Sequence, residues 1–266
     1  MATNVTIIGA TGRMGGSLVR AIAEFPDLSL HGAVTNPGQP DAGKDAGDLA
    51  GCGRLGVTVQ TDLAAALHGA DVAIDFSSGK ATAANVAACA KAKVPLMLGT
   101  TGFDEAAEVA LADAARVIPL IVAANTSLAL NVLLELVRRA AQSLPASYDI
   151  EIFEAHHRHK VDAPSGTALA LARAAADGRG TRLPTRPQPT GVENGPRESG
   201  TIGFSVARGG DVVGEHDVRF LGAGEQLKLT HVATDRAIFA RGALTGASWL
   251  VGKAPGRYKM ADVLGL

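Results

Sequence analysis

The densest group of chemically useful side chains in the sequence runs from His156 to Lys160, where five cationic or titratable residues follow one another. The chain then turns at Ser165 into a predicted helix whose first amides belong to Gly166 and Thr167. The first N–H groups of a helix have no partner within the helix and attract anions, and neighbouring cations add to that attraction. The segment therefore predicts a binding site for carboxylates or phosphates.

The same segment can also transfer protons. A histidine has a reference pKa of about 6.5 and can donate a proton near neutral pH. A lysine stays charged unless it is desolvated, so Lys160 can hold a carboxylate or act as a proton donor. His156 and Lys160 are therefore the candidate acids, and His157 is a candidate for holding the anion.

Three other interpretations of this segment remain open. A metal site is disfavoured because the histidines follow the spacing H-H-x-H without a paired cysteine or carboxylate, and we predict no metal. A solvated basic loop explains the charge but not why the cations lead directly into a Ser-Gly-Thr helix start. Nucleic-acid binding needs a wider basic surface with aromatic residues, which the sequence lacks.

A glycine-rich loop near the N-terminus predicts a second anion site. It lies between a β-branched run, Val5 to Ile8, and a helical pattern that begins at Met14. The glycine spacing is G-x-x-G-x-x-G, which permits a tight turn, a close approach to a pyrophosphate and close helix packing. A plain strand-to-helix turn is the alternative. The predicted cofactor-binding residues of this loop are Gly9, Ala10, Thr11, Gly12, Arg13 and Met14.

The end of the second predicted strand bears on which nicotinamide cofactor is used. An acidic residue there would bind the adenine ribose hydroxyls and repel a 2′-phosphate, but the sequence reads Val34-Thr35-Asn36. Arg13 can reach a 2′-phosphate. We predict that Thr35 contacts the cofactor and that NADPH is accepted at least as well as NADH.

Two further loops follow predicted strands and belong at the same sheet edge, where ligands bind in such folds. Each can instead be an N-capped helix start, with Thr101, Asp104 or Ser127 as the cap. Two such loops beside a glycine loop favour a nicotinamide pocket. Its predicted residues are Gly99, Thr100 and Thr101 from the first loop, and Ala123, Ala124, Asn125 and Thr126 from the second.

The order of predicted elements places these residues in an α/β fold. Strands alternate with helices over the first 125 residues or so, which is typical of a Rossmann-like, doubly wound parallel sheet. After Asn125 we predict a long helix, an alternating strand from Asp149, a helix from Gly166 and three further strands. This order indicates a second α+β domain with a mixed or antiparallel sheet. We predict a loop from Gly178 to Gly200 and a final helix from about Asp235 to Val251.

The composition narrows the class of protein. The 266 residues carry a formal net charge of −1, so no global field would hold nucleic acid or an acidic membrane. No apolar run approaches the roughly 20 residues of a membrane span, and no signal-peptide pattern opens the sequence. Two cysteines without metal-ligand spacing suit a reducing cytosol, and we expect a cytoplasmic protein.

Together these motifs resemble the dihydrodipicolinate reductase family (4-hydroxy-tetrahydrodipicolinate reductase) over nearly the whole chain. The segment EAHHRHKVDAPSGTAL, from Glu154 to Leu169, looks like the family signature. Supporting matches are GATGRMG at Gly9, DAGDLAG at Asp45, IDFS at Ile74, GTTGF at Gly99, GTIGF at Gly200 and GDVVGEH at Gly210.

The resemblance implies the NAD(P)H-dependent reduction of 4-hydroxy-tetrahydrodipicolinate to tetrahydrodipicolinate, in the diaminopimelate route to lysine. It implies a dinucleotide-binding domain of residues 1–125 and 236–266, and a substrate-binding domain of residues 126–235 that builds a homotetramer. By the same resemblance, His156 and Lys160 match proton donors, His157 matches a substrate-binding residue, and Gly166 with Thr167 match the helix start that binds a carboxylate.

The sequence departs from some family members at two places. Thr35 and Asn36 stand where some members carry an acid followed by arginine, so cofactor preference does not transfer. Thr126 and Ala129 replace an aromatic residue and a glycine in a loop expected near the nicotinamide. Two rival functions remain: another dinucleotide enzyme, such as an aspartate or homoserine dehydrogenase, and a non-catalytic NADP(H) sensor.

Overall fold

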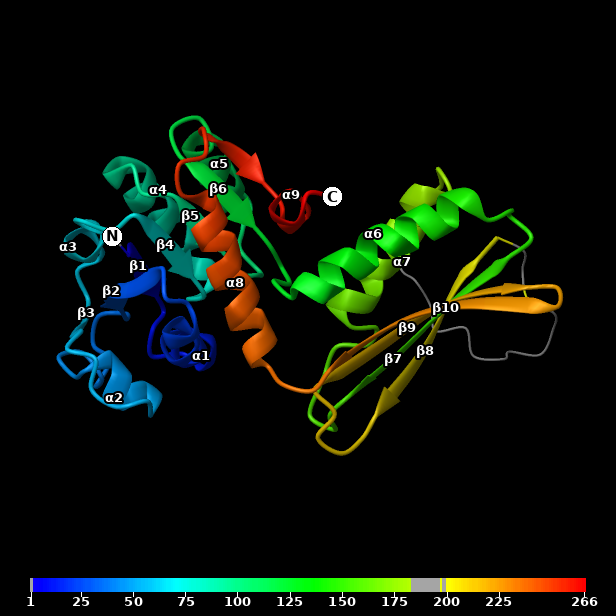
Figure 1. Cartoon of the computed structure of the whole chain (residues 1–266), viewed down its shortest axis with the longest axis horizontal. Coiled ribbons are helices and arrows are strands. Elements are labelled where there is room, and N and C mark those ends of the chain that lie inside the picture. Colours follow the sequence, from blue (N-terminus) through cyan, green and yellow to red (C-terminus); the bar gives the residue numbers. More distant parts are fainter. Residues whose placement is uncertain (1, 183–196, 198–199) are drawn as a thin grey trace. The chain divides into compact units, whose positions relative to one another are not determined.

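The computed structural model describes residues 2–182, 197 and 200–266. They form two compact units, one of residues Met1–Leu128 with Ala237–Leu266 and the other of residues Ala129–Arg236. Each unit contains a sheet with its own helices (Figure 1). The predicted fold class is confirmed: a Rossmann-like parallel sheet plus a second domain with a mixed sheet.

The sheet of the first unit has seven strands within the described residues, and every pairing in it is parallel. The central strands are mostly apolar and largely buried, as parallel strands are when helices cover both faces of the sheet. Their spatial order is β11 (Gly256–Tyr258), β6 (Pro119–Val122), β5 (Leu96–Leu98), β4 (Val72–Asp75), β1 (Thr3–Ile8), β2 (Leu28–Val34) and β3 (Val59–Gln60).

Helices cover both faces of this sheet. The side chains of α1 (Arg13–Ala21) and α8 (Ala237–Leu250) pack with Ile7 and Ile74 on one face. Those of α3 (Leu63–Leu67), α4 (Thr82–Ala92) and α5 (Glu105–Ala114) pack on the other face. The described part of the unit also contains the short helices α2 (Ala46–Ala50) and α9 (Met260–Leu264) and the 3₁₀ helices η1 (Ile22–Glu24) and η2 (Gly79–Ala81).

The C-terminal segment belongs to the first unit. α8 confirms the predicted final helix, and its buried side chains include Leu244 and Leu250. Two elements after it were not predicted, namely β11, which pairs with β6, and α9. Among the described residues, no helix is both long and apolar enough to cross a bilayer.

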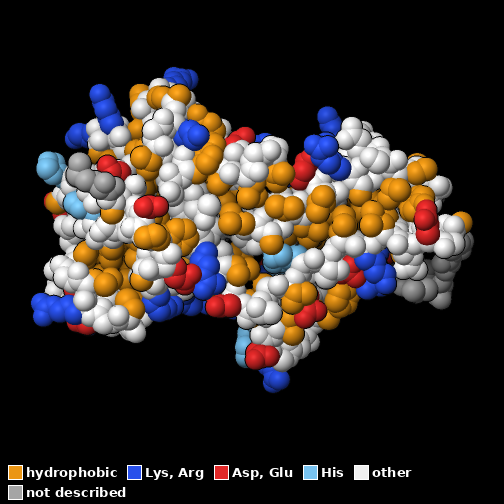
Figure 2. Space-filling view, in the orientation of Figure 1, with side chains coloured by type: hydrophobic (Ala, Val, Ile, Leu, Met, Phe, Trp, Pro, Cys, Tyr) orange, Lys and Arg blue, Asp and Glu red, His pale blue; other side chains and the backbone are white. Residues whose placement is uncertain are grey.

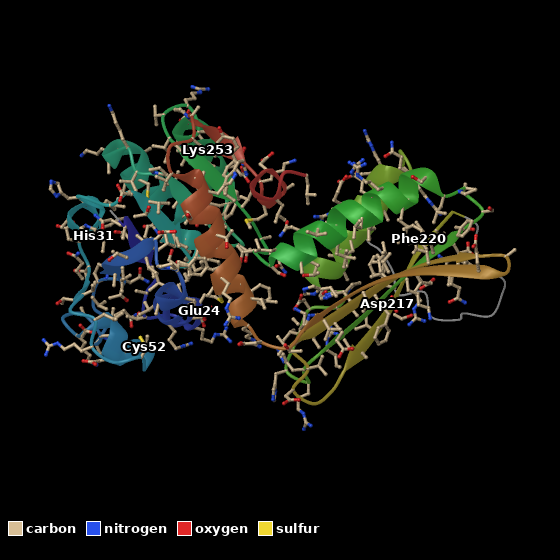
Figure 3. All side chains as sticks on the ribbon, in the orientation of Figure 1. Glu24, His31, Cys52, Asp217, Phe220 and Lys253 are labelled. Atoms are coloured by element: carbon tan, nitrogen blue, oxygen red, sulfur yellow. The ribbon has the colours of Figure 1, made fainter. Side chains whose placement is uncertain are left out.

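The second unit has a four-stranded mixed sheet within the described residues. β7 (Asp149–His156) pairs parallel with β8 (Ile202–Arg208) and antiparallel with β9 (Gly214–Gly222), which pairs antiparallel with β10 (Glu225–Ala233). Two helices, α6 (Leu128–Ser143) and α7 (Gly166–Gly178), pack on one face of this sheet. Phe220 of β9 is fully buried between the sheet and these helices (Figure 3).

The predicted loop from Gly178 to Gly200 starts too early, because Gly178 is the last residue of α7. A Cβ at Gly178 would lie 2.2 Å from the carbonyl oxygen of Arg138, so the glycine permits the close approach of α7 to α6. Most of the predicted loop, residues 183–196 and 198–199, lies outside the described residues.

Candidate active site

The glycine loop of the first unit connects β1 to α1 as predicted. Gly9 has a positive φ of +81°, a conformation that favours glycine, and its N–H donates to the carbonyl of Val34. Gly12 is the N-cap of α1, no side chain in the described part of the chain caps the helix, and the first turn carries no acid. The first amides of α1 are therefore available to an anion.

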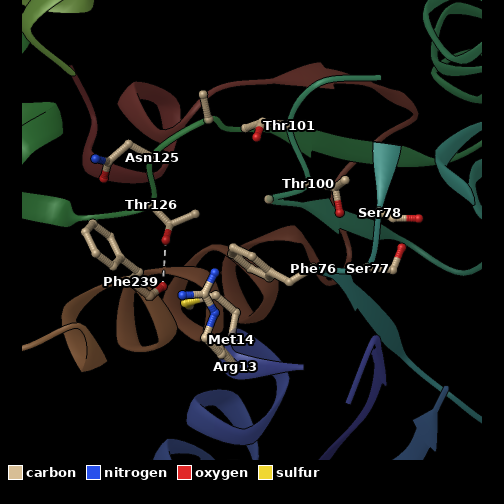
Figure 4. Close-up of a pocket in the computed structure, with 12 residues that line it drawn as sticks. Arg13, Met14, Phe76, Ser77, Ser78, Thr100, Thr101, Asn125, Thr126 and Phe239 are labelled. Carbon is tan, nitrogen blue, oxygen red and sulfur yellow. Dashed lines mark hydrogen bonds between the residues drawn. The ribbon is translucent and has the colours of Figure 1, made fainter. Parts of the chain in front are cut away.

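A cavity of about 450 Å³ opens beside this loop in the first unit (Figure 4). Eight of the predicted cofactor-binding residues line it: Arg13, Met14, Gly99, Thr100, Thr101, Ala124, Asn125 and Thr126. The other four lining residues were not predicted from the sequence; they are Phe76, Ser77, Ser78 and Phe239.

The remaining predicted cofactor residues support the cavity without lining it. Thr35 is buried, and its hydroxyl lies 2.8 Å from that of Thr11. Ala10 is also buried and donates its N–H to the carbonyl of Val34, and Ala123 donates to the carbonyl of Leu98. These contacts fix the ends of β2 and β5 against the neighbouring loops.

Asp75, at the end of β4, holds two sides of the cavity together. This fully buried carboxylate accepts hydrogen bonds from the N–H of Ser77, at 2.8 Å, and from the side chains of Asn85 and Thr100. The bonds fix the turn after β4 to the loop after β5. Asp75 belongs to the family match IDFS at Ile74, so the sequence marked its position but not its contacts.

Thr126 links the loop after β6 to α8. Its hydroxyl donates to the carbonyl of Phe239, 2.6 Å away, across 113 positions of sequence (Figure 4). A Cβ at Gly242 would lie 1.8 Å from the carbonyl oxygen of Thr126, so α8 packs directly on this loop. Asp104 caps α5 through the N–H of Ala107, which is the N-cap alternative considered for that loop.

In the second unit, His156 closes β7 and is almost buried. Its Nδ1 lies 2.6 Å from Oε2 of Glu154, which is fully buried. Burial lowers the pKa of His156 below its usual value, although the Glu154 carboxylate opposes that shift. Burial would raise the pKa of Glu154, but Arg208, His156 and the Ser165 amide outweigh it, and the pKa is lowered. The pair is therefore a carboxylate beside an imidazole that is easily deprotonated.

The other predicted residues of the cationic segment lie in the turn after β7. The amine of Lys160 forms an ion pair with Asp162 at 2.8 Å. Nε2 of His157 lies 3.2 Å from the guanidinium of Arg236, while its buried Nδ1 has no hydrogen-bond partner among the described residues. The structure thus adds Arg236 to the predicted cations of this segment.

α7 starts as the sequence predicted. Ser165 is its N-cap and accepts from the N–H of Ala168 at 3.1 Å, so Gly166 and Thr167 are the first two helical residues. The Ser165 hydroxyl also lies 3.0 Å from Nε2 of His216 on β9. Gly166 and Thr167 thus lie at a helix start beside cations, which is the arrangement expected of an anion site.

Both halves of the chain match the same family. The description "Dihydrodipicolinate reductase, N-terminus" applies to residues 3–126, and "Dihydrodipicolinate reductase, C-terminus" applies to residues 129–264. The chain belongs to the dihydrodipicolinate reductase family. The resemblance stated from the motifs is therefore confirmed.

Relatives of the same name match over the full length. The 4-hydroxy-tetrahydrodipicolinate reductase of Anaeromyxobacter dehalogenans (strain 2CP-C) is 51% identical, over 99% of this chain and 98% of its own. That of Alkalilimnicola ehrlichii is 50% identical, over all of both chains. A solved dihydrodipicolinate reductase from Paenisporosarcina sp. TG-14, described as dipicolinate-bound, has a TM-score of 0.79 at 23% identity and covers 98% of this chain and 99% of its own. That structure supports the fold.

Within this family site, Arg208, His216 and Arg236 were not predicted from the sequence. They follow Leu169, the end of the signature segment, by 39 positions or more, and no local pattern connects them to it. Of the three, only His216 belongs to a family match, GDVVGEH at Gly210. Among the described residues, no group of three or more His, Cys, Asp or Glu side chains is placed to hold a metal ion.

Proposed function

We propose that the chain reduces 4-hydroxy-tetrahydrodipicolinate to tetrahydrodipicolinate with NADPH or NADH, in the diaminopimelate route to lysine. The observation that carries this proposal is the full-length match to reductases of that name at about 50% identity, combined with the site around His156. Family membership makes the chain an oxidoreductase and disfavours the aspartate or homoserine dehydrogenase and sensor alternatives.

The residues of the first unit fit a dinucleotide. The uncapped start of α1 suits a pyrophosphate, and Gly12 leaves room for it. When bound, the reduced nicotinamide supplies the hydride. We propose that Gly9 to Met14 hold the phosphates, that Thr35 lies beside the adenosine ribose, and that the loops from Gly99 to Thr101 and from Ala123 to Thr126 hold the nicotinamide end.

The residues of the second unit fit a small dicarboxylate. We propose that Lys160 and His157 bind carboxylate oxygens and that the amides of Gly166 and Thr167 bind a second carboxylate. The dipicolinate in the Paenisporosarcina protein is a ligand of this class and supports the assignment. The ion pair between Lys160 and Asp162 would have to open, or share its lysine, when the substrate binds.

We assign the proton transfer to His156, with Lys160 as the second candidate donor. Loss of water from the substrate leaves a conjugated imine, hydride adds at C4, and a proton is needed at C3. Although burial lowers the pKa of His156, a doubly anionic substrate beside the ring favours the imidazolium and raises that pKa. The positive side chains and helix amides stabilise the negative charge that develops during transfer.

A coupled assay tests the proposal, with substrate made in situ from pyruvate and aspartate semialdehyde. We expect steady NADPH oxidation by the wild-type chain. His156→Ala and Lys160→Ala should each lower turnover by roughly 10²-fold or more, as expected for a lost general acid. Absence of turnover in the wild type would refute the function, and near-normal turnover in both variants would refute the roles.

A homotetramer and a cytoplasmic location remain predictions. Exposed apolar side chains on α6 (Val132 and Leu136) and on β10 (Leu227 and Val232) support a subunit contact through the second unit. Figure 2 shows hydrophobic side chains gathered over α6. Light scattering on the purified chain measures the mass and tests the tetramer directly.

A further inference from the structure

We propose that Glu154 is the positioning residue of the reaction, fixing His156 in the Nδ1–H tautomer and tying it to the carboxylate-binding start of α7. This inference rests on the proposed function, because it assigns a partner to the proposed proton donor. It gives Glu154 a role in the reaction, where burial in the sheet alone would suggest a purely structural residue.

The register of the sheet brings the participants together. Along β7 the side chains alternate, so Ile150 and Ile152 lie on the buried face and are followed on that face by Glu154 and His156. On either side of β7, His156 is paired with Arg208 of β8, and Glu154 is paired with His216 of β9. The buried face of one strand thus changes from apolar core to charged site within two residues.

Glu154 uses all its hydrogen-bonding capacity. Arg208 donates to both carboxylate oxygens, at 2.8 Å each. Oε2 also contacts Nδ1 of His156 at 2.6 Å, and Oε1 also accepts from the N–H of Ser165 at 3.0 Å. Each oxygen therefore has two partners, which is what an ionised carboxylate accommodates, and its fully buried charge is balanced by Arg208.

The tautomer of His156 follows from this arrangement. An ionised carboxylate only accepts hydrogen bonds, so Nδ1 of His156 must carry the hydrogen that lies between the two residues. In neutral His156 the unprotonated nitrogen is then Nε2. Consequently, the proton that His156 gains and donates is carried on Nε2, the nitrogen away from Glu154. The carboxylate itself keeps its charge and stabilises the imidazolium when it forms.

The same carboxylate also sets the start of α7. Its bond to the Ser165 amide holds the N-cap residue, and the next two amides are those proposed to bind a substrate carboxylate. Arg208 also holds the turn between β7 and α7, because its guanidinium donates to the carbonyl of Asp162 in that turn. Acid and anion site therefore share one buried anchor, and a shift of Glu154 moves both.

Ring nitrogen NMR of the full-length, ¹⁵N-labelled wild-type chain tests the tautomer without substrate or cofactor, with His156→Ala used to assign the signals. We expect neutral His156 to carry its hydrogen on Nδ1. In Glu154→Gln the side-chain amide can donate to Nδ1, so we expect the Nε2–H form to become populated. An Nε2–H tautomer in the wild type would overturn the proposal, whatever the assay of activity gives.

Kinetics then test the positioning role. We expect Glu154→Gln to lower kcat by roughly 10²-fold or more, as for other carboxylates that orient a catalytic histidine. Glu154→Asp, which keeps the charge, should retain more activity. Glu151→Gln makes the same substitution on the other face of β7 and serves as the matched control, with kcat near the wild-type value.

A double-mutant cycle separates positioning from general structural support. If Glu154 acts through His156, adding Glu154→Gln to His156→Ala should leave kcat within about 3-fold of His156→Ala alone. Because Glu154 also holds the Ser165 amide, Glu154→Gln should raise KM for the substrate, and this rise should persist in both backgrounds. A further loss of kcat as large as in the wild-type background would overturn the proposal. A wild type without reductase activity would instead refute the proposed function and leave the NMR result to stand alone.

Discussion

Gly15 of α1 lies against the carbonyl of Gly9, so that a Cβ on Gly15 would stand only 2.1 Å from that oxygen. The neighbouring Gly16 has no such constraint, because a Cβ on Gly16 would lie 3.6 Å from its nearest neighbour, which is the end of the Arg20 side chain. The two glycines follow one another in the same helix but have different reasons to be there.

Gly15→Ala should therefore displace α1 from the glycine loop. We expect it to lower the free energy of unfolding by about 3 kcal/mol, as in an overpacked core, and to weaken NADPH binding. Gly16→Ala should be neutral or stabilise by about 0.5–1 kcal/mol, because alanine favours a helix over glycine. Chemical denaturation and fluorescence titration with NADPH measure both effects. Equal stability of the two variants would contradict the packing argument.

Asp162 competes with the substrate for Lys160. The ion pair is 2.8 Å long, and the Asp162 side chain is 59% exposed, so the pair contributes about 0.2–1 kcal/mol. Asp162→Asn should release the lysine and lower KM for the substrate by roughly two- to five-fold, with kcat little changed. Asp211→Asn, which removes an exposed negative charge from the loop before β9, is the control. If both variants lower KM equally, long-range charge and not the ion pair is responsible.

The sequence predicted the parts of the fold whose signals are local. The run from Val5 to Ile8 ends at Gly9 and gave β1 and the glycine loop. The alternating pattern from Asp149 predicted β7, and Ser165 predicted the start of α7. β11 was missed because three residues, Gly256–Tyr258, become a strand only by pairing with β6. A local pattern cannot show such a pairing.

The site residues that were predicted are also those with local signals in the sequence. His156, Lys160 and the helix start after Ser165 were predicted because they are adjacent in sequence. Arg208 and His216 reach Glu154 only through the register of β8 and β9, more than 50 positions later. The buried position of Glu154 could have been read from the alternation that starts with Ile150, because it occupies the same face.

Arg13 is predicted to select for the 2′-phosphate of NADPH. It lines the cavity of the first unit, and β2 ends without an acid that would repel that phosphate. We expect the wild-type KM for NADPH to be no higher than that for NADH. Arg13→Ala should raise KM for NADPH roughly ten-fold, the effect of one lost hydrogen bond to a charged group, and raise KM for NADH less. Arg116→Ala removes an exposed arginine elsewhere and serves as the control; an equal rise for both cofactors in Arg13→Ala would contradict the prediction.

His216 makes the stability of the chain depend on pH. Burial lowers the pKa of His216 from 6.5 to about 4. The positive charges of His156, His231 and Lys160 add to this shift, and the Glu154 carboxylate opposes it. Between these values the unfolded chain binds a proton that the folded chain does not, so stability is lost as the pH falls from about 6.5 to about 4. The loss from this group amounts to about 3 kcal/mol.

His216→Gln removes that titration and should flatten the curve of unfolding free energy against pH between 7.5 and 4.5, relative to the wild type. Below that range, carboxylates with lowered pKa values, such as Glu135 and Asp162, add a loss common to both proteins. His68→Gln, which removes an exposed imidazole, is the matched control. Urea unfolding at each pH gives the curves, and identical slopes for the wild type and His216→Gln would show that folding does not lower the pKa of His216.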